Sequence, residues 1–332
     1  MFKNVSIIGD GAMGTVMAML LCEKGISVRM WGHDGEQLKQ FEKARENTKF
    51  LPGYKIPQGV GFEPMDDKIM QGADLLVSAV PCQYMRSVWQ RLKNHFPKEI
   101  PIVSVAKGIE NDTYLRPDQI VKEVLGEEIK FVALSGPTIA DELVRKLPAT
   151  ACAASSDEQL AKEVQITFNT PWFRIYTNSD IVGVELAGAM KNVIAIAAGI
   201  IDGIGAGDNA KAALLSRGLA EITRLGIALG AHRDTFSGLT GLGDLVTTCI
   251  SPKGRNRSFG ERIGKGMSAK EAQGATQSVI EGASTCKAVA ELAKTANVEM
   301  PITETIYAIL FQNKTVQEAI SELMQRQLKA EY

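Results

Sequence analysis

Two lysines and one aspartate stand where their side chains could carry out acid–base chemistry. Lys191 lies inside the apolar segment 186–199, where a charged side chain needs a partner. Burial and a neighbouring cation would lower its pKa towards the range useful for proton transfer, unless the lysine reaches solvent from a helix surface. Asp244, set among glycine and leucine residues, could pair with a buried lysine or cap a helix. Lys107 follows a predicted strand, where it could meet a bound anion or carbonyl, or be an ordinary surface charge.

A basic stretch from Ser251 to Lys270 holds six lysine or arginine residues and a single acidic one. Within it, Gly254, Arg255 and Asn256 combine a flexible turn with a guanidinium group and an amide. This combination suits a phosphate monoester. A solvated basic face is the alternative.

A glycine-rich turn near the N-terminus has the spacing of a dinucleotide-binding loop. The pattern G-x-G-x-x-G is formed by Gly9, Asp10, Gly11, Ala12, Met13 and Gly14. It follows a strand predicted at 5–8 and opens a helix predicted at 15–24, which is the context that such a loop requires. Gly9 permits the turn, Gly11 lets the backbone approach a pyrophosphate, and Gly14 lets helix and strand pack closely. The N–H groups of the helix N-terminus then favour the phosphates.

The end of the second predicted strand, residues 27–31, bears on the choice between NAD and NADP. An acidic residue there binds the ribose 2′-hydroxyl of NAD, whereas a basic one favours the 2′-phosphate of NADP. The sequence continues with Gly32, His33 and Asp34. Asp34 favours NAD and His33 weakly favours NADP, so the expected cofactor is NAD or NADP.

The elements that must position these residues change in character near residue 180. Strands are predicted at 5–8, 27–31, 75–80, 102–105, 131–134, 150–154 and 174–176. Several are apolar throughout, as is typical of strands buried on both faces of a parallel sheet, and amphipathic stretches separate most of them. Beyond residue 180, Ala-, Leu- and Ile-rich stretches have helical spacing. We therefore expect an α/β protein, with a Rossmann-like doubly wound sheet at 1–180 that binds dinucleotide and an all-helical substrate-binding domain at 181–332.

Composition excludes several classes of protein. A chain of 332 residues corresponds to about two domains, and a net charge of -1 gives no electrostatic footprint for nucleic acid. The five cysteines form no C-x-x-C pair, which favours a reducing cytoplasm, and the three histidines lack metal-ligand spacing, so no metal is expected. No apolar run approaches the ~20 residues of a membrane span.

Taken together and in this order, these residues resemble the NAD(P)-dependent glycerol-3-phosphate dehydrogenase family. The resemblance covers nearly the whole chain. It is densest at residues 183–192, 207–213, 241–245 and 255–260, with further matches at 279–282 and 300–302.

The resemblance implies reversible hydride transfer between a nicotinamide cofactor and dihydroxyacetone phosphate, which gives sn-glycerol 3-phosphate for phospholipid synthesis, by a homodimer. It implies that Lys191 is the proton donor and acceptor, that Lys107 is a second active-site lysine, and that Asp244 supports the catalytic lysine. The implied substrate contacts are Lys107, Gly136, Thr138, Asn192, Thr248, Gly254, Arg255 and Asn256. The implied cofactor contacts are Gly9, Gly11, Ala12, Met13, Gly14, His33, Lys107, Ala140, Arg255, Val279 and Glu281.

Four residues depart from the family pattern. His33 only partly substitutes for the basic residue that bacterial members often carry after the second strand. Met13 stands where a tryptophan is common, and Gly254 replaces a small hydroxyl residue. Asp10 stands where the family has a small residue, and its carboxylate is unfavourable beside a pyrophosphate unless it points away.

Two other functions stay open. A dehydrogenase of the 6-phosphogluconate or β-hydroxyacid type shares the two-domain plan and a catalytic lysine, but the Arg255–Asn256 stretch and Asp244 argue against it. A non-catalytic dinucleotide sensor would keep the glycine loop and could lose Lys107, Lys191 or Asp244, all three of which are present.

Overall fold

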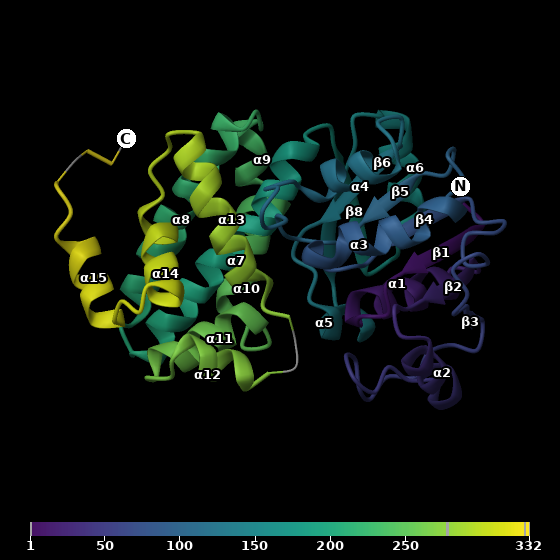
Figure 1. Ribbon diagram of the computed structural model, residues 1–332, viewed down its shortest axis with the longest axis horizontal. Helices are drawn as coiled ribbons and strands as arrows, with labels where there is room; N and C mark the ends of the chain where they lie inside the picture. Colours follow the sequence, from purple (N-terminus) through teal and green to yellow (C-terminus); the bar gives the residue numbers. More distant parts are fainter. Residues whose placement is uncertain (1, 277–278, 329, 332) are drawn as a thin grey trace.

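The structure is a computed structural model that describes residues 2–276, 279–328 and 330–331. A part built around a sheet, formed by the N-terminal half of the chain, lies beside an all-helical part (Figure 1). This arrangement confirms the predicted α/β fold class. The last strand ends at Asn178 and a long helix begins at Ile181, which agrees with a division near 180. The boundary itself, at 180/181, stays a prediction.

The sheet has eight strands, of which one pair is antiparallel. The strands are β1 (Asn4–Ile8), β2 (Ser27–Trp31), β3 (Val60–Phe62), β4 (Leu75–Ser78), β5 (Ile102–Ser104), β6 (Phe131–Ser135), β7 (Ala149–Ala154) and β8 (Phe173–Asn178). Their order is β3-β2-β1-β4-β5-β6-β7-β8, and all neighbours are parallel except β6 and β7. The chain therefore winds outwards in opposite directions from β1 and β4. Ligands of such sheets bind at this reversal, outside the carboxyl ends of the strands.

All seven strands expected from the sequence are present, with ends that differ by at most two residues. The edge strand β3 was not predicted, because three residues with a central glycine are too few to show a pattern. Neighbouring residues of β1 face opposite sides of the sheet, and Ile7 and Ile8 are both fully buried. The sheet is thus covered on both faces, as the uniformly apolar strands predict.

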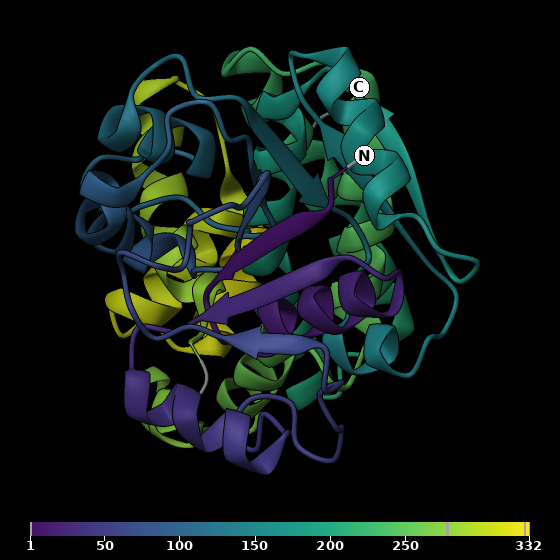
Figure 2. The ribbon, with the colours of Figure 1, turned by 90° about the vertical axis from the view of Figure 1, so that its right-hand side faces the viewer.

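Two layers of helices cover the sheet. The helices of this part are α1 (Ala12–Glu23), α2 (Gly35–Ala44), α3 (Cys82–Leu92), α4 (Pro117–Leu125), α5 (Ala140–Val144) and α6 (Glu158–Phe168), with a 3-10 turn at Lys93–His95. Helices α1, α5 and α6 pack on one face, and α3 and α4 pack on the other. Figure 2 shows α1 and the α3–α4 pair on opposite sides of the strands. The carboxyl ends of β5 and β6 lead into loops that contact the helical part.

The helical part is assembled around one long helix, α7. Its elements are α7 (Ile181–Gly203), α8 (Asp208–Ala228), α9 (Arg233–Ser237), a π-helical turn (Leu239–Gly243), α10 (Asp244–Ile250), α11 (Arg255–Gly264), α12 (Ala269–Gly274), α13 (Glu281–Thr295), α14 (Pro301–Phe311) and α15 (Val316–Met324). Asp180 caps α7 by accepting from the backbone N–H of Gly183, and it also accepts from Thr235 of α9. By length and hydropathy α7 could cross a membrane, but it is almost wholly buried among the other helices, as a core helix is.

Glycines bring α7 and α11 into close contact. A Cβ at Gly260 of α11 would collide with the backbone carbonyl of Ile196, and a Cβ at Gly199 of α7 would collide with that of Arg257. Side chains at these positions would push the helices apart. This close packing sets the start of α11, with Arg255, beside the middle of α7.

Candidate active site

Asp244 binds two lysines at once. Its Oδ1 accepts from Lys191 Nζ at 2.7 Å, and its Oδ2 accepts from Lys107 Nζ at 2.7 Å. Thr248, one helical turn after Asp244, lies 2.6 Å from Lys191 Nζ through its hydroxyl. Lys191 and Asp244 are 5% and 1% exposed, so their charges are held out of water and depend on one another. Asp244 is the first residue of α10 rather than a helix cap, and Lys191 is buried rather than reaching solvent.

The environment of Lys191 eases the loss of its proton. Burial lowers its pKa from the ordinary 10.5 to about 8, and the positive charge of Lys107 acts in the same direction. The carboxylate of Asp244 opposes both effects. A lysine with such a pKa can give up and regain a proton near neutral pH.

Three distant elements bring these side chains together. Lys191 comes from the middle of α7, Asp244 from the start of α10 and Lys107 from the loop after β5. One turn before Lys191, a Cβ at Gly188 would lie 2.9 Å from Ser135 Oγ at the end of β6. The same Cβ would lie 3.5 Å from Lys107 Cγ. Glycine at this position therefore lets α7 approach the carboxyl edge of the sheet.

The loop after β6 supplies two further hydrogen-bond acceptors for Lys107. Its ammonium donates to the carbonyl of Gly136 at 2.8 Å and to Thr138 Oγ1 at 3.2 Å. Gly136 has a φ of +146°, and a Cβ there would lie 2.9 Å from Ala151 Cα of β7. Only glycine fits this turn, which explains the Gly136 position in the predicted substrate loop.

A second group of polar residues connects the ends of α11 and α13 to α7. Asn256 Nδ2 donates to Asn192 Oδ1 at 3.0 Å, and Asn256 Oδ1 accepts from the backbone N–H of Gly282 at 2.9 Å. Both asparagines are buried. Asn192 follows Lys191 directly in α7, so these contacts hold the start of α11 next to Lys191.

Arg255 and Glu281 lie beside this group. Arg255 is the first residue of α11, after Gly254 as N-cap, and its side chain is exposed. Glu281 begins α13, and burial raises the pKa of its carboxyl. The positive charges of Arg255, Lys107 and Lys191 counteract that rise. Positive charge thus gathers around one carboxylate and at a helix N-terminus, which suits an anionic ligand.

The remaining basic residues of the 251–270 stretch are partly accounted for by ion pairs. Arg257 pairs with Asp202, and both Arg257 and Lys265 pair with Glu261. Arg257 and Lys265 are therefore engaged within the protein, and the Arg257 side chain is only 14% exposed. Arg255 is in none of these pairs, and its positive charge lowers the pKa of Glu281.

The glycine loop has the shape of a dinucleotide cradle. Gly9 has a φ of +115°, and a Cβ there would lie 2.8 Å from the backbone of Ala79 after β4. A Cβ at Gly14 would collide with the carbonyl of Gly9. Gly11 is the N-cap of α1, and a Cβ built on it would meet nothing within 4 Å, so the space beside it is open to a ligand. The loop, at the reversal of strand order, therefore fits the pyrophosphate of NAD or NADP.

The other predicted cofactor contacts are placed in three regions. Ala12 and Met13 begin α1 and pack partly against the core beneath it. Ala140 begins α5, and Val279 and Glu281 lie at the start of α13. His33 is exposed just after β2, where its carbonyl accepts from Arg91 of α3 at 3.2 Å.

Sequence reasoning missed two residues of this region. Arg91 lies 58 residues from His33, and nothing in its surroundings in the sequence connects it to the end of β2. The backbone N–H of Cys82, at the start of α3, supports the Glu281 carboxylate. A helix start after β4 is the one signal in the sequence that could have pointed to Cys82.

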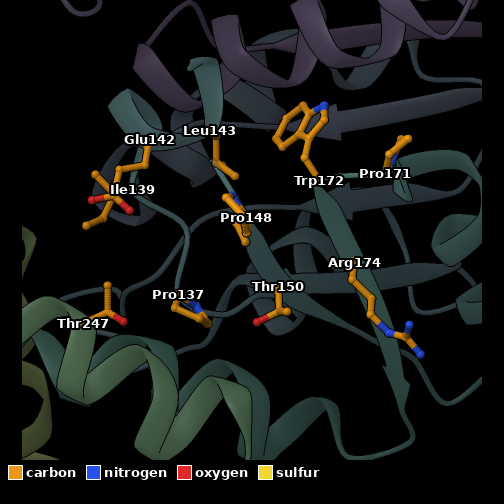
Figure 3. A pocket seen from close by; sticks show the side chains of 11 residues that line it. Pro137, Ile139, Glu142, Leu143, Pro148, Thr150, Pro171, Trp172, Arg174 and Thr247 are labelled. Atoms are coloured by element: carbon orange, nitrogen blue, oxygen red, sulfur yellow. The ribbon is translucent and has the colours of Figure 1, made fainter. Parts of the chain in front are cut away.

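A separate pocket of about 450 Å³ lies behind the loop after β6. Figure 3 shows Pro137 and Thr247 on one side of it and Trp172 and Arg174 of the β8 region on the other. None of the predicted site residues lines this pocket. It is therefore distinct from the cluster around Asp244.

Two family models match the chain. The NAD-dependent glycerol-3-phosphate dehydrogenase N-terminus matches residues 4–161, and the corresponding C-terminus matches residues 180–321. A glycerol-3-phosphate dehydrogenase [NAD(P)+] from Chlorobium phaeobacteroides is 46% identical over 99% of both chains. One from Geobacter sp. strain M21 is 46% identical over 100% of this chain and 99% of its own.

Solved structures are similar to this chain at two levels of sequence identity. A glycerol-3-phosphate dehydrogenase from Coxiella burnetii is 35% identical with a TM-score of 0.94, covering 98% of this chain and 99% of its own. A ketopantoate reductase family protein from Ralstonia eutropha is 16% identical with a TM-score of 0.62, over 93% of this chain and 97% of its own, and therefore shares only the fold.

Proposed function

The chain belongs to the NAD-dependent glycerol-3-phosphate dehydrogenase family, and from that premise we propose how its residues carry out the reaction. The reaction is the reversible reduction of dihydroxyacetone phosphate to glycerol 3-phosphate with NAD(P)H. The reduced nicotinamide supplies the hydride when it is bound. The protein must bind the phosphate, orient the carbonyl and provide a proton.

Lys191 is the proposed proton donor in reduction and the proton acceptor in oxidation. As negative charge develops on the C2 oxygen of the substrate, an ammonium at this place stabilises it and then protonates it. The lowered pKa, about 8, supports the role because it makes both protonation states accessible.

Asp244 and Lys107 support this step. Asp244 keeps Lys191 oriented and offsets its charge through a 2.7 Å hydrogen bond. Lys107 shares the same carboxylate and adds positive charge near the developing oxyanion. Thr248 accepts the second hydrogen bond of Lys191, and Lys107 is held by Gly136 and Thr138.

We propose that the N-terminus of α11 binds the phosphate group of the substrate. Arg255 supplies the guanidinium group, and the backbone at Gly254 and Asn256 belongs to the first turn of the helix. Asn192, which contacts Asn256, connects this grip to Lys191. Fixing the phosphate in this way would hold the carbonyl in place for reaction.

The cofactor is NAD or NADP, and its proposed contacts fall on both parts of the molecule. The glycine loop would hold the pyrophosphate, through Gly9, Gly11, Ala12, Met13 and Gly14. His33 would lie near the adenosine ribose. The rest of the cofactor would be contacted by Ala140, Lys107, Arg255, Val279 and Glu281.

The two-lysine bridge at Asp244 is the observation that carries this assignment. The direct test follows nicotinamide absorbance with purified protein, dihydroxyacetone phosphate and either NADH or NADPH. Rapid oxidation is expected. Folded protein that binds NADH, but neither oxidises it with this ketone nor reduces NAD with glycerol 3-phosphate, would overturn the assignment in favour of a sensor or another dehydrogenase.

We also propose that the enzyme is a cytoplasmic homodimer that serves phospholipid synthesis. All five cysteines are free thiols and four of them are buried, which supports a reducing compartment. The dimer is proposed from the family resemblance alone. Sedimentation equilibrium is expected to give twice the chain mass, and a monomer at micromolar concentration would overturn the dimer.

A further inference from the structure

The carboxyl group of Asp10 lies where a side chain at the end of β2 would project. Gly32 directly follows β2, and a Cβ on it would lie 2.6 Å from Asp10 Oδ2 and 2.7 Å from Asp10 Cγ. Gly32 has no positive φ, so its backbone would allow a side chain were the space free. The acid of a dinucleotide-binding fold that recognises the ribose 2′-hydroxyl normally comes from the end of this strand. Here an acid from the glycine loop fills the same space.

The Asp10 carboxyl group is held in that place by neighbouring side chains. Gln37 Nε2 of α2 donates to Asp10 Oδ2 at 2.6 Å, and Gln37 Oε1 accepts from Lys49 Nζ at 2.8 Å. The backbone carbonyl of Asp10 accepts from Asn47 Nδ2 at 2.8 Å, and the same amide donates to Thr15 Oγ1 of α1. Asn47 is fully buried. The position of Asp10 is therefore fixed by the fold before any ligand arrives.

This orientation removes the repulsion between Asp10 and the pyrophosphate that the sequence led us to expect. A carboxylate beside a pyrophosphate is unfavourable unless it points away, and the Asp10 carboxylate is turned towards Gly32 and Gln37. A Cβ built on Gly11 would meet no atom within 4 Å, so the space beside this part of the loop is open to the pyrophosphate. The negative charge is thus placed at the ribose end of the loop.

Asp34 and Arg91, two other charged residues at this edge, have partners within the protein. Asp34 caps α2, with its Oδ1 accepting from the backbone N–H of Glu36 and Gln37. Arg91, the cation beside His33, makes two hydrogen bonds to Asp66, at 2.6 and 2.8 Å. Asp34 is therefore less suited than Asp10 to receive a ribose, and Arg91 is already neutralised.

We infer that Asp10 accepts the adenosine ribose 2′-hydroxyl and makes this enzyme select NAD over NADP. A carboxylate accepts a hydrogen bond from the hydroxyl of NAD, whereas it repels the dianionic 2′-phosphate of NADP. The inference rests on the proposed use of a nicotinamide dinucleotide, and it concerns binding rather than turnover. The residue that selects NAD over NADP therefore lies in the glycine loop. The contribution of Gly32, at the end of β2, is to leave space for the Asp10 carboxylate.

Cofactor binding without substrate tests the inference. Dissociation constants of NADH and NADPH are measured by nicotinamide fluorescence for the wild type, Asp10→Asn and Asp34→Asn. Asp10→Asn keeps the size of the side chain and the contact with Gln37 but removes the charge. Asp34→Asn is the matched control, because it removes a charge at the same edge and asparagine still caps a helix.

The wild type is expected to bind NADH about 10- to 100-fold more tightly than NADPH, the scale of one hydrogen bond to a charged group. Asp10→Asn should lower this ratio by about 10-fold or more, and Asp34→Asn should leave it unchanged. A wild type that binds NADPH as tightly as NADH overturns the inference, and so does an unchanged ratio in folded Asp10→Asn. Failure of the enzyme to turn over dihydroxyacetone phosphate would contradict the proposed function and leave these ratios intact.

Discussion

Lys191 and Asp244 are 53 residues apart in the chain, and their side chains meet at 2.7 Å in the interior of the protein. The second oxygen of the same carboxylate binds Lys107. One buried carboxylate therefore compensates two ammonium groups. Loss of any one of the three groups would leave a charge in the interior without its full compensation. The substitutions below separate their contributions.

Removal of the proton donor should abolish most of the turnover. Lys191→Ala is expected to lower kcat for dihydroxyacetone phosphate by about 10²- to 10⁴-fold, the usual scale for a general acid. NADH binding, measured by fluorescence, should change little, because the glycine loop is untouched. Lys253→Ala, which removes a half-exposed lysine that pairs with Asp141, is the control and should keep its turnover. Near-normal turnover in Lys191→Ala would disprove its role.

The two directions of the reaction should respond to pH in opposite ways. Reduction needs protonated Lys191, so its kcat/KM should fall as the pH rises through about 8. Oxidation needs the neutral amine, so its kcat/KM should rise over the same interval. Initial rates in both directions between about pH 6 and pH 10 check this. Profiles that move together would mean that another group titrates.

Loss of the Asp244 charge should move the pH profile. In Asp244→Asn the attraction that holds the Lys191 proton disappears while the repulsion from Lys107 stays, so the pKa of Lys191 falls further. The descending limb of the reduction profile should therefore shift to lower pH. Thr248→Val removes a hydrogen bond to Lys191 without changing the charge, and it should shift the limb less. An unmoved limb in Asp244→Asn would argue against this coupling.

The phosphate grip should be visible as a substrate-specific effect. Arg255→Ala is expected to raise KM for dihydroxyacetone phosphate by about 10- to 100-fold, the value of a hydrogen bond to a charged group. Dihydroxyacetone without its phosphate should be reduced equally slowly by the wild type and the variant. Arg257→Ala, on the same helix but paired with Asp202, is the control and should lower Tm rather than raise KM. If both arginine variants raise KM alike, the phosphate site has been misplaced.

A buried carboxyl far from the site should make stability depend on pH. Glu221 of α8 is 3% exposed and accepts from the backbone N–H groups of Ile302 and Thr303, at the start of α14. Burial raises its pKa from 4.5 to about 7. A raised carboxyl pKa means that the folded state binds more protons than the unfolded state, so stability falls as the pH rises from about 4.5 through about 7.

Thermal unfolding of the wild type and Glu221→Gln over this interval checks the effect. The Tm difference, variant minus wild type, should increase with pH, because glutamine keeps an acceptor and loses the charge. A difference that is flat with pH would show that Glu221 does not titrate there.

The sequence by itself determined the features that depend on local pattern. Apolar runs marked seven strands because a strand buried on both faces needs apolar residues at every position. The glycine spacing marked the cradle because a tight turn and close helix packing exclude a Cβ at Gly9 and Gly14. Lys191 stood out because a charge in an apolar segment needs a partner.

Tertiary structure alone decided what depends on distant neighbours. The sequence left Asp244 open between a helix cap and a lysine partner, and only the packing of α7 and α10 against the end of β5 brings it to Lys107 and Lys191. The sequence also placed the Asp10 carboxylate unfavourably close to a pyrophosphate. Only the structure shows that this carboxylate occupies the space beside Gly32 instead. The sequence gives the type of each residue. The charges, hydrogen bonds and free space around its side chain come from segments that meet only when the protein folds.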